Sequence, residues 1–233
     1  MQTMPAQAPL AMITLAIEQS TAVGSIALFR EREPLGERSW EDAAARHRDL
    51  FQAVRGLMDE HRLTPSDVTA FAVDLGPGSF SGLRIALAAA KAFALPGNAT
   101  VYGVTSGEVM ATALHRETGA DRIVLLGDAR RERVWWAAFA GDATGRTAAT
   151  TPYSLADIAR LPDVLSPGVA VATPDWLRLG DRLRSLCPPG VRLVERRVVP
   201  AARTLGELAI ERMARGAPSE PLSPVYLHPP VKA

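Results

Sequence analysis

The chain has 233 residues, of which 47% are hydrophobic and 22% charged, so it can bury the core of one large domain or of two smaller ones. Its formal net charge of +1 gives no bulk field that would draw it onto nucleic acid or a membrane surface. Cys187 is the only cysteine, so no intrachain disulfide can form. Arg30 is the first basic residue, which argues against a secretory signal, and no apolar run is long enough to span a bilayer. We therefore expect a cytoplasmic protein.

The first half of the chain begins with a predicted β-hairpin, because Ile13, Leu15 and Ile17 alternate with other residues and a polar turn follows. A helix with apolar residues at three- and four-residue steps comes next, and two further strand–helix pairs complete this half. The predicted strands are 12–17, 23–29, 36–40, 70–74 and 101–105, and the predicted helices are 43–60, 82–95 and one beginning at the capping box Thr105–Glu108.

The second half repeats this order without a convincing residue-level repeat. Its predicted strands are 122–129, 133–140, 147–151, 169–173 and 191–195, and its predicted helices are 155–160, 175–187 and 203–215. Both halves, 1–118 and 119–233, thus have the order β-β-β-α-β-α-β-α, and the second ends in a proline-rich extended tail. This order favours the α/β actin-like ATPase (ASKHA, ribonuclease H-like) fold, although a fold alone does not give a function.

The stretch DLGPGSFSGLR at 74–84 places glycines between a predicted strand and a helix. A phosphate-binding P-loop needs a second glycine at position 81 and a following lysine, and the dinucleotide fingerprint also needs glycine there, but Ser81 occupies that position. Two interpretations stay open: a turn that packs the helix tightly on the sheet, or an anion site at the helix N-terminus. With the hairpin turn, the residues of this candidate vestigial nucleotide or anion site are Glu18, Ser20, Thr21, Gly76, Gly78 and Ser79.

The helix that follows is apolar nearly all round, with only Arg84 and Lys91 on a common polar stripe. Small side chains let another backbone approach closely, so either core burial or a subunit interface is expected for this helix. The candidate interface residues on it and on the preceding helix are His47, Leu50, Val54, Arg84, Ala86, Ala89, Ala90, Lys91 and Phe93.

The sequence shows no catalytic or metal-binding apparatus. The histidines at 47, 61, 115 and 228 are isolated, none of them forms an i,i+4 pair, and no nucleophile motif is present. We therefore expect neither a metal site nor nucleophilic catalysis.

Several segments resemble the TsaB (YeaZ) family, in order along essentially the whole chain. LAIEQSTAVGSIAL resembles the opening LAIDTST…SVAL of that family, and GPGSFSGLRIALAAAKAFA resembles its signature GPGSFTGLRIG.A.AKGLA. YGVTSGEVMA, GDARRERVWWAAF and PLSPVYLHPPV resemble its later segments. The chain departs from the family pattern at Glu18–Gln19, Ser81, Gly107 and Trp136.

This resemblance implies a non-catalytic partner of the paralogous enzyme TsaD, which adds threonylcarbamoyl to the adenosine beside the anticodon of tRNAs reading A-starting codons. It also implies contact with the ATPase TsaE, homodimer formation when the partner is absent, only indirect contact with tRNA and no membrane association. No cofactor is expected on this chain, although ATP or ADP can belong to the complex. TsaD carries two metal-binding histidines in the segment NHLEGH, and these positions fall on Ser106 and Met110 here.

A second hypothesis is a small nucleotide-binding ATPase or kinase of the actin-like superfamily. It needs an acid–glycine hairpin turn, where this chain has Glu18 and Ser20, and a second acid in the other half, for which Asp128 is the candidate. It also needs an adenosine-binding glycine motif, which the sequence lacks.

Overall fold

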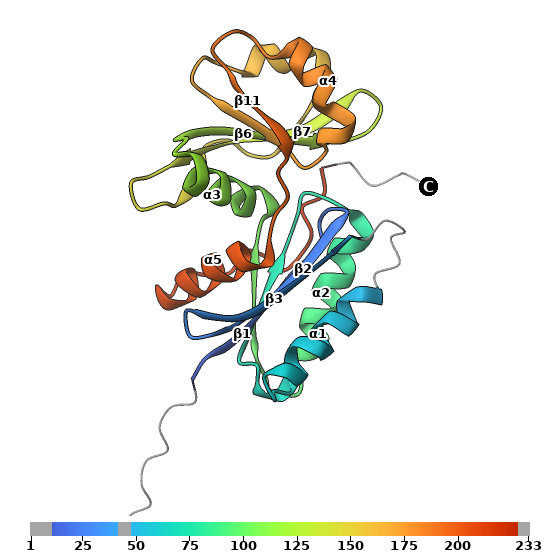
Figure 1. The fold of residues 1–233 in the computed structure, drawn as a ribbon, viewed down its shortest axis with the longest axis vertical. Helices are drawn as coiled ribbons and strands as arrows, with labels where there is room; N and C mark the ends of the chain where they lie inside the picture. The colour runs from blue at the N-terminus through green and yellow to red at the C-terminus, as the bar shows by residue number, and fades with distance from the viewer. Residues whose placement is uncertain (1–10, 42–47, 228–233) are drawn as a thin grey trace, which may run out of the picture.

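The computed structural model describes residues 11–41 and 48–227. Two α/β halves follow one another along the long axis of the molecule, each built around one mixed β-sheet (Figure 1). His47 and the predicted start of the first helix lie outside the described residues.

The first sheet has five strands in the order β3-β2-β1-β4-β5. β1 pairs antiparallel with β2 and β2 with β3, whereas β1, β4 and β5 run parallel. β1 and β4 are buried along their whole length, as expected for central strands covered on both faces. The strands are β1 Ile13–Glu18, β2 Val23–Arg30, β3 Glu33–Glu41, β4 Ala70–Asp74 and β5 Thr100–Val104.

The second sheet repeats this arrangement in the order β11-β10-β6-β7-β8, and β9 pairs with β7 on the same edge as β8, at the opposite end of β7. β6 again pairs antiparallel with the strand that follows it and parallel with a strand that comes later in the chain. The recurring strand order confirms the predicted duplication and the actin-like fold. The strands are β6 Arg122–Asp128, β7 Arg133–Gly141, β8 Thr147–Ala149, β9 Ser154–Asp157, β10 Ala170–Thr173 and β11 Arg192–Arg197.

The helix predicted at 155–160 is wrong. Residues Ser154–Asp157 form β9, with Leu155 opposite Trp135 of β7, and a 3-10 helix, η2 Ile158–Val164, follows. Pro162 lies inside η2, where it prevents a regular α-helix. Pairing with β7 is a long-range contact, so a local periodicity could not reveal it.

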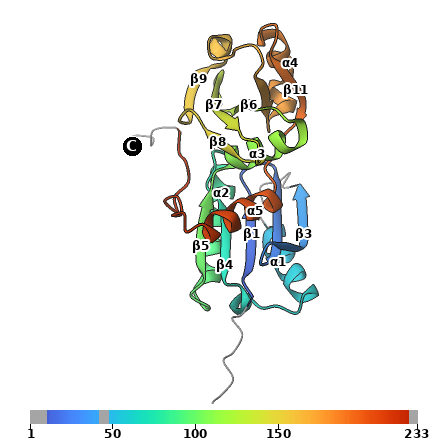
Figure 2. The same cartoon turned by 90° about the vertical axis from the view of Figure 1, so that its left-hand side faces the viewer.

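Helices and sheets alternate in five layers (Figures 1 and 2). The helices α1 and α2 cover the outer face of the first sheet, and α4 with η2 covers the outer face of the second. The middle layer holds α5, which packs on the first sheet, and α3, which packs mainly on the second. The helices are α1 Arg48–Glu60, α2 Phe80–Ala94, α3 Ser106–Thr118, α4 Trp176–Leu186 and α5 Ala202–Ala214, and a short 3-10 helix η1 spans Pro65–Asp67.

The middle layer crosses the predicted boundary between residues 118 and 119. The helix α5 comes from the second half of the chain, yet its Gly206 lies so close to Phe29 of β2 that a Cβ there would collide with the ring. Small residues on the facing strands, such as Ala16 and Ala72, leave the space that the helix fills. Each half of the sequence therefore completes its core with the other half.

After α5, residues 217–227 run along the open edge of the first sheet. The Tyr102 hydroxyl donates to the Pro218 carbonyl at 2.9 Å, and the Ser219 hydroxyl accepts from the Gly103 N–H at 3.0 Å. We call this segment the strap. It covers β5, whose unpaired edge would otherwise be a template for strand addition. Within the described ranges, no helix is long and apolar enough to cross a membrane.

Candidate functional site

The glycine loop between β4 and α2 packs directly on the turn of the first hairpin. A Cβ added at Gly82 would collide with the Gln19 carbonyl oxygen, and one added at Gly78 would collide with that of Ser20. The Ser79 N–H donates to the Ser20 carbonyl at 2.6 Å, and the Ser79 hydroxyl caps α2 by accepting from the Gly82 N–H at 3.3 Å. These glycines therefore let two backbones meet, which agrees with the structural interpretation of the loop.

Side chains of the hairpin turn form hydrogen bonds with groups of the turn itself. One carboxylate oxygen of Glu18, Oε1, accepts from the N–H and from the hydroxyl of Ser20, both at 2.6 Å. The Thr21 hydroxyl accepts from the Val23 N–H at 3.1 Å. The structure thus brings Glu18, Ser20 and Ser79 of the predicted turn site together, and Ser20 stands buried at the position where a phosphate would need a bare backbone.

Two acids lie side by side at the ends of β1 and β4. Ile17 pairs with Val73 across the parallel strands, so Glu18 and Asp74 are the next residues in register, and their exposed fractions are 0% and 1%. Burial, followed by the charge of Asp74, raises the pKa of Glu18 well above its ordinary value. Burial also raises the pKa of Asp74, although hydrogen bonds from the Gly76 N–H and the Ser106 hydroxyl oppose this effect.

The two positions that the resemblance aligns with metal-binding histidines, Ser106 and Met110, lie inside the protein. Ser106 is 1% exposed and donates its hydroxyl to Asp74 at 2.8 Å, and Met110 is fully buried in the core under the second sheet. The predicted capping box is confirmed, since Thr105 and Glu108 exchange bonds at the start of α3. Among the described residues, no group of three or more His, Cys, Asp or Glu side chains could hold a metal ion.

Asp128, the candidate second acid, is already neutralised by arginines. Its Oδ2 lies 3.0 Å from Arg178 and 3.4 Å from Arg130. Burial alone would raise the pKa of Asp128, but the Arg130 N–H and the Arg178 side chain lower it overall. The nearby Asp175 accepts the Asp128 N–H at 2.8 Å, and burial raises its pKa. Asp128 therefore belongs to a local ion-pair network at the end of β6.

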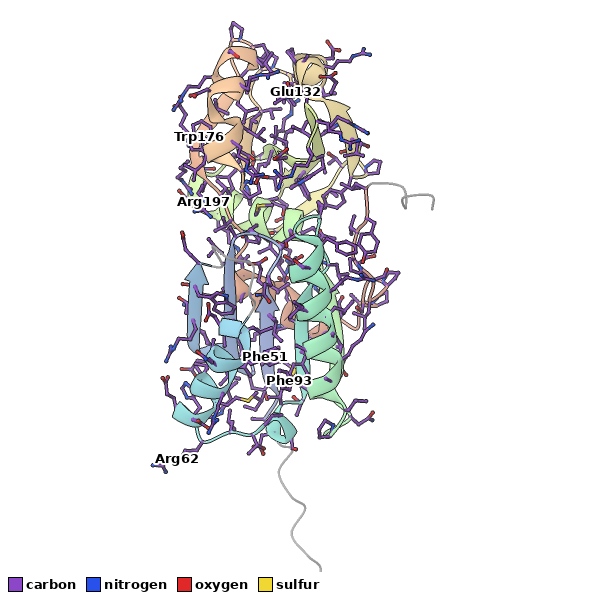
Figure 3. All side chains as sticks on the ribbon, turned by 90° about the vertical axis from the view of Figure 1, so that its right-hand side faces the viewer. Phe51, Arg62, Phe93, Glu132, Trp176 and Arg197 are labelled. Carbon is purple, nitrogen blue, oxygen red and sulfur yellow. The ribbon has the colours of Figure 1, made fainter. Side chains whose placement is uncertain are left out.

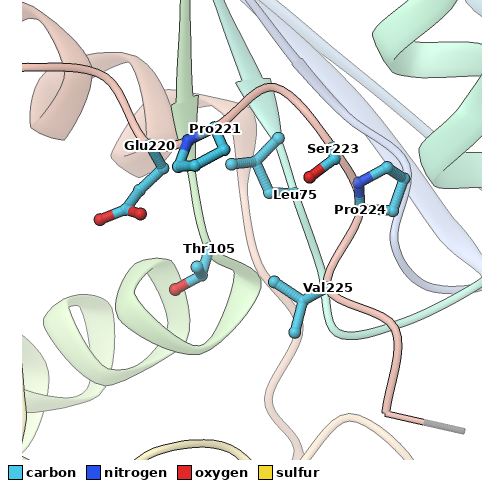
Figure 4. Close-up of a pocket in the computed structure, with 7 residues that line it drawn as sticks. All are labelled: Leu75, Thr105, Glu220, Pro221, Ser223, Pro224 and Val225. Atoms are coloured by element: carbon cyan, nitrogen blue, oxygen red, sulfur yellow. The ribbon is translucent and has the colours of Figure 1, made fainter. Parts of the chain in front are cut away.

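A small cavity of about 200 Å³ lies beneath the strap (Figure 4). Its lining combines apolar side chains with two hydroxyl groups and one carboxylate, and no cluster of titratable groups. The lining residues are Leu75, Thr105, Glu220, Pro221, Ser223, Pro224 and Val225.

The predicted interface residues divide between the core and the surface. Five of them are buried in the core of the first half and cannot touch a partner, which corrects their assignment to an interface: Leu50, Val54, Ala86, Ala89 and Ala90. Arg84 and Lys91 are exposed on α2, and Phe93 is half-buried between α1 and α2, where its ring lies 6.2 Å from that of Phe51 (Figure 3). The helix is thus buried on one side only.

The exposed side of α2 includes Arg84 and Lys91 of the predicted interface, but the sequence reasoning did not single out its apolar residues. Phe80 is 58% exposed and Leu95 is 80% exposed, and Ala88 lies between them on the same side. Arg84 lies over the Phe80 ring at 4.6 Å, and the strap residue Tyr226 contacts the same ring. We call this surface the α2 face, with residues Phe80, Arg84, Ala88, Lys91, Leu95 and Tyr226. The four- and three-residue steps of its helical members could have revealed it.

Comparisons with known proteins identify the family. The model of the family described as "TsaD: tRNA N6-adenosine threonylcarbamoyltransferase" matches residues 40–170. The chain is 26% identical to "tRNA threonylcarbamoyladenosine biosynthesis protein TsaB" of Escherichia coli, over 93% of this chain and 94% of that protein. It is 31% identical to the Bacillus subtilis protein of the same name, over 53% of each. A solved structure, "YeaZ from Pseudomonas aeruginosa", is 28% identical with a TM-score of 0.77, covering 93% of this chain and 100% of that one. The chain therefore belongs to the TsaB (YeaZ) family, within the wider group that the threonylcarbamoyltransferase model describes.

Proposed function

We propose that this chain is a non-catalytic subunit in tRNA threonylcarbamoyladenosine biosynthesis, where it supports a catalytic TsaD-type paralogue. The observation that carries the proposal is that the two positions aligned with the histidines of that paralogue hold other residues, which are buried in this chain. The Ser106 hydroxyl donates a hydrogen bond to Asp74, and the Met110 side chain is packed in the core. Neither side chain therefore faces a cavity that could hold a metal or a substrate. The occupied hairpin turn supports the same conclusion, because its backbone is covered by the glycine loop.

In this proposal the α2 face is the surface for the catalytic partner. Large apolar side chains exposed together on one surface mark interaction sites in soluble proteins, and Phe, Tyr and Arg are enriched in the cores of protein interfaces. Phe80, Arg84 and Tyr226 form such a group at one end of the face, and Leu95 marks the other end. Small residues between them, Ala88 and Ala92, let a partner helix approach closely.

The remaining roles belong to the same proposal. The α2 face pairs with a second copy of the chain when the catalytic partner is absent, TsaE joins the assembly once the catalytic partner is bound, and tRNA is contacted only indirectly. The near-neutral net charge supports the last point, because no excess of positive charge attracts the tRNA phosphates to this chain.

A matched pair of substitutions tests the partner surface. Leu95→Asp places a charge on the α2 face, and Leu177→Asp places the same charge on α4 of the other half, where Leu177 is 85% exposed. We expect Leu95→Asp to weaken binding to the TsaD-type protein of the same organism at least tenfold, or about 1.4 kcal/mol, because a carboxylate would be buried against the partner. The control should bind like the wild type.

Titration calorimetry and co-purification measure this difference, and thermal melts of both variants show whether folding is intact. A reconstituted tRNA modification assay with both proteins gives the second readout. Equal binding by the two variants would exclude the α2 face, and modification activity of this chain without a TsaD-type protein would exclude the non-catalytic role.

A further inference from the structure

The buried acids Glu18 and Asp74 present an unusual set of hydrogen bonds. One oxygen of each carboxyl group is fully used: Glu18 Oε1 accepts twice from Ser20, and Asp74 Oδ1 accepts from the Gly76 N–H at 2.6 Å and from Ser106 at 2.8 Å. The other oxygen of each, Glu18 Oε2 and Asp74 Oδ2, is buried without a hydrogen-bond donor. A buried polar atom left without a hydrogen bond destabilises the folded state, because it has lost its bonds to water and gained none in return.

The two unused oxygens belong to neighbouring side chains. Glu18 and Asp74 continue the parallel register of Ile17 and Val73, so both carboxyl groups emerge on the same side of adjacent strands. Two carboxylates on adjacent strands in the protein interior would repel each other strongly, because the interior screens charge poorly. A single proton between them removes one charge and supplies the missing hydrogen bond at the same time.

We propose that Glu18 and Asp74 share one bound proton, and that this protonated pair fastens the first hairpin turn to the start of α3. Through Ser20 the pair holds the turn against which α2 is seated, and through Ser106 it holds the helix that crosses to the second sheet. The proton is therefore a structural ligand of the junction between the two halves. This inference does not depend on the proposed function.

The surroundings offer no other source of neutralisation. Among the described residues, neither carboxylate forms an ion pair with Lys, Arg or His, and the charged groups on the packed elements have partners of their own. On α3, Glu108 is paired with Arg212 of α5 at 2.7 Å, and on α2 the guanidinium of Arg84 lies over Phe80. From the second half, the Tyr153 hydroxyl donates to Thr105, and burial raises its pKa.

Linkage gives the sign of the pH dependence. The folded chain keeps a proton that the unfolded chain releases above the ordinary glutamate pKa of about 4.3. The stabilisation is therefore complete below that pH and is lost as pH rises through the raised pKa of the pair. Between the ordinary glutamate pKa and the raised pKa of the pair, the folded state holds one more proton than the unfolded state. In that range the pair should raise the unfolding equilibrium constant by up to about tenfold per pH unit.

Glu18→Gln tests the proposal, because the amide N–H₂ can donate to Asp74 without a titrating proton. Glu37→Gln, an exposed position on β3, is the matched control. We expect denaturant unfolding of the full chain between about pH 5 and about pH 9 to show the steep dependence in the wild type and the control, and a slope reduced by up to one proton in Glu18→Gln. His115 contributes equally to the pH dependence of the wild type, the control and Glu18→Gln, so it cancels when their slopes are compared.

Infrared spectroscopy of the folded wild type gives an independent readout. We expect the carbonyl band of a protonated carboxyl group near neutral pH, present in the control and absent in Glu18→Gln. If Glu18→Gln does not fold, this band in the wild type and the control decides alone. Parallel slopes for wild type and Glu18→Gln, absence of the band, or a melting temperature that rises with millimolar MgCl₂ in the wild type but not in Glu18→Gln would each overturn the shared proton.

Discussion

At the scale of single residues, His115 is a second group whose protonation the fold controls. It is 8% exposed, and its two ring nitrogens face two carbonyl oxygens: Nδ1 lies 3.0 Å from that of Ala120 and Nε2 lies 2.9 Å from that of Asp142. A carbonyl oxygen can only accept, so both nitrogens donate when both bonds are made, and the ring is then a cation. The hydrogen bond to Asp142, followed by the one to Ala120, raises the pKa of His115 against the opposing effect of burial.

His115→Gln should therefore reduce the pH dependence of stability at mildly alkaline pH. A histidine whose pKa is raised in the fold contributes its stabilisation fully below the ordinary pKa of about 6.5, and loses it as pH rises through the raised value. Chemical unfolding of wild type and variant at a series of pH values measures the difference, which should shrink above neutral pH. A constant difference from about pH 5 to about pH 9 would mean that the ring is neutral throughout.

At the scale of elements, the close contact between α2 and the hairpin turn predicts that a methyl group added at Gly82 lowers the free energy of unfolding. Gly82→Ala should destabilise the protein by roughly 1–3 kcal/mol, because the new Cβ meets the backbone of Gln19, which cannot move aside cheaply. Gly56→Ala in α1 is the matched control, since a Cβ there has no neighbour within 4 Å. It should stabilise the helix by about 0.5–1 kcal/mol through its effect on the unfolded chain.

Denaturant midpoints of the two variants test this contrast. A neutral Gly82→Ala would mean that the loop and the turn can separate, and would reopen the turn as an anion site. The contrast depends on packing alone, because both glycines lie in helices and both substitutions add one methyl group.

The elements also show where sequence reasoning succeeds and where it fails. The duplicated strand order follows from local periodicity, which tertiary packing reinforces. The same periodicity places Leu83, Ala86 and Ala90 on one face of the helix, but it does not show that this face meets the sheet rather than a partner. β9 was predicted as a helix because its pairing with β7 is not local. The apolar part of the α2 face, Phe80, Ala88 and Leu95, lies outside the predicted interface, because helical periodicity groups residues on a face without showing which face the sheet covers.

The acid pair illustrates the same limit for the site. The sequence predicts a turn at Glu18 and a loop after Asp74, but only the register of β1 and β4 makes the two carboxyl groups neighbours. Similarly, nothing local indicates that Ser20 is covered by Ser79, which lies 59 positions later in the numbering. Contacts between the ends of parallel strands depend on the whole topology.

At the scale of the whole molecule, the shared middle layer makes the two halves depend on each other. Without α5 the first sheet would expose the face that includes Ala16, Phe29 and Ala72. Without α3, which follows β5 in the first half, the second sheet would lose the cover of Leu125 and Phe139. A domain needs its own complete core to fold alone, and neither half of the sequence carries one.

We therefore predict a single cooperative unfolding transition for the full chain. Trp40 lies in β3 of the first half, whereas Trp135, Trp136 and Trp176 lie in the second, so Trp40→Phe leaves a fluorescence signal that reports only the second half. In that variant the fluorescence midpoint should coincide with the midpoint from far-UV circular dichroism, which reports both halves. Leu183→Ala, in α4 on the outer face of the second sheet, should lower both midpoints together, because unfolding there removes the support of α3 and then of α5. Two separated midpoints, with only the fluorescence transition moved by Leu183→Ala, would show that the halves are independent and that the middle layer does not couple them.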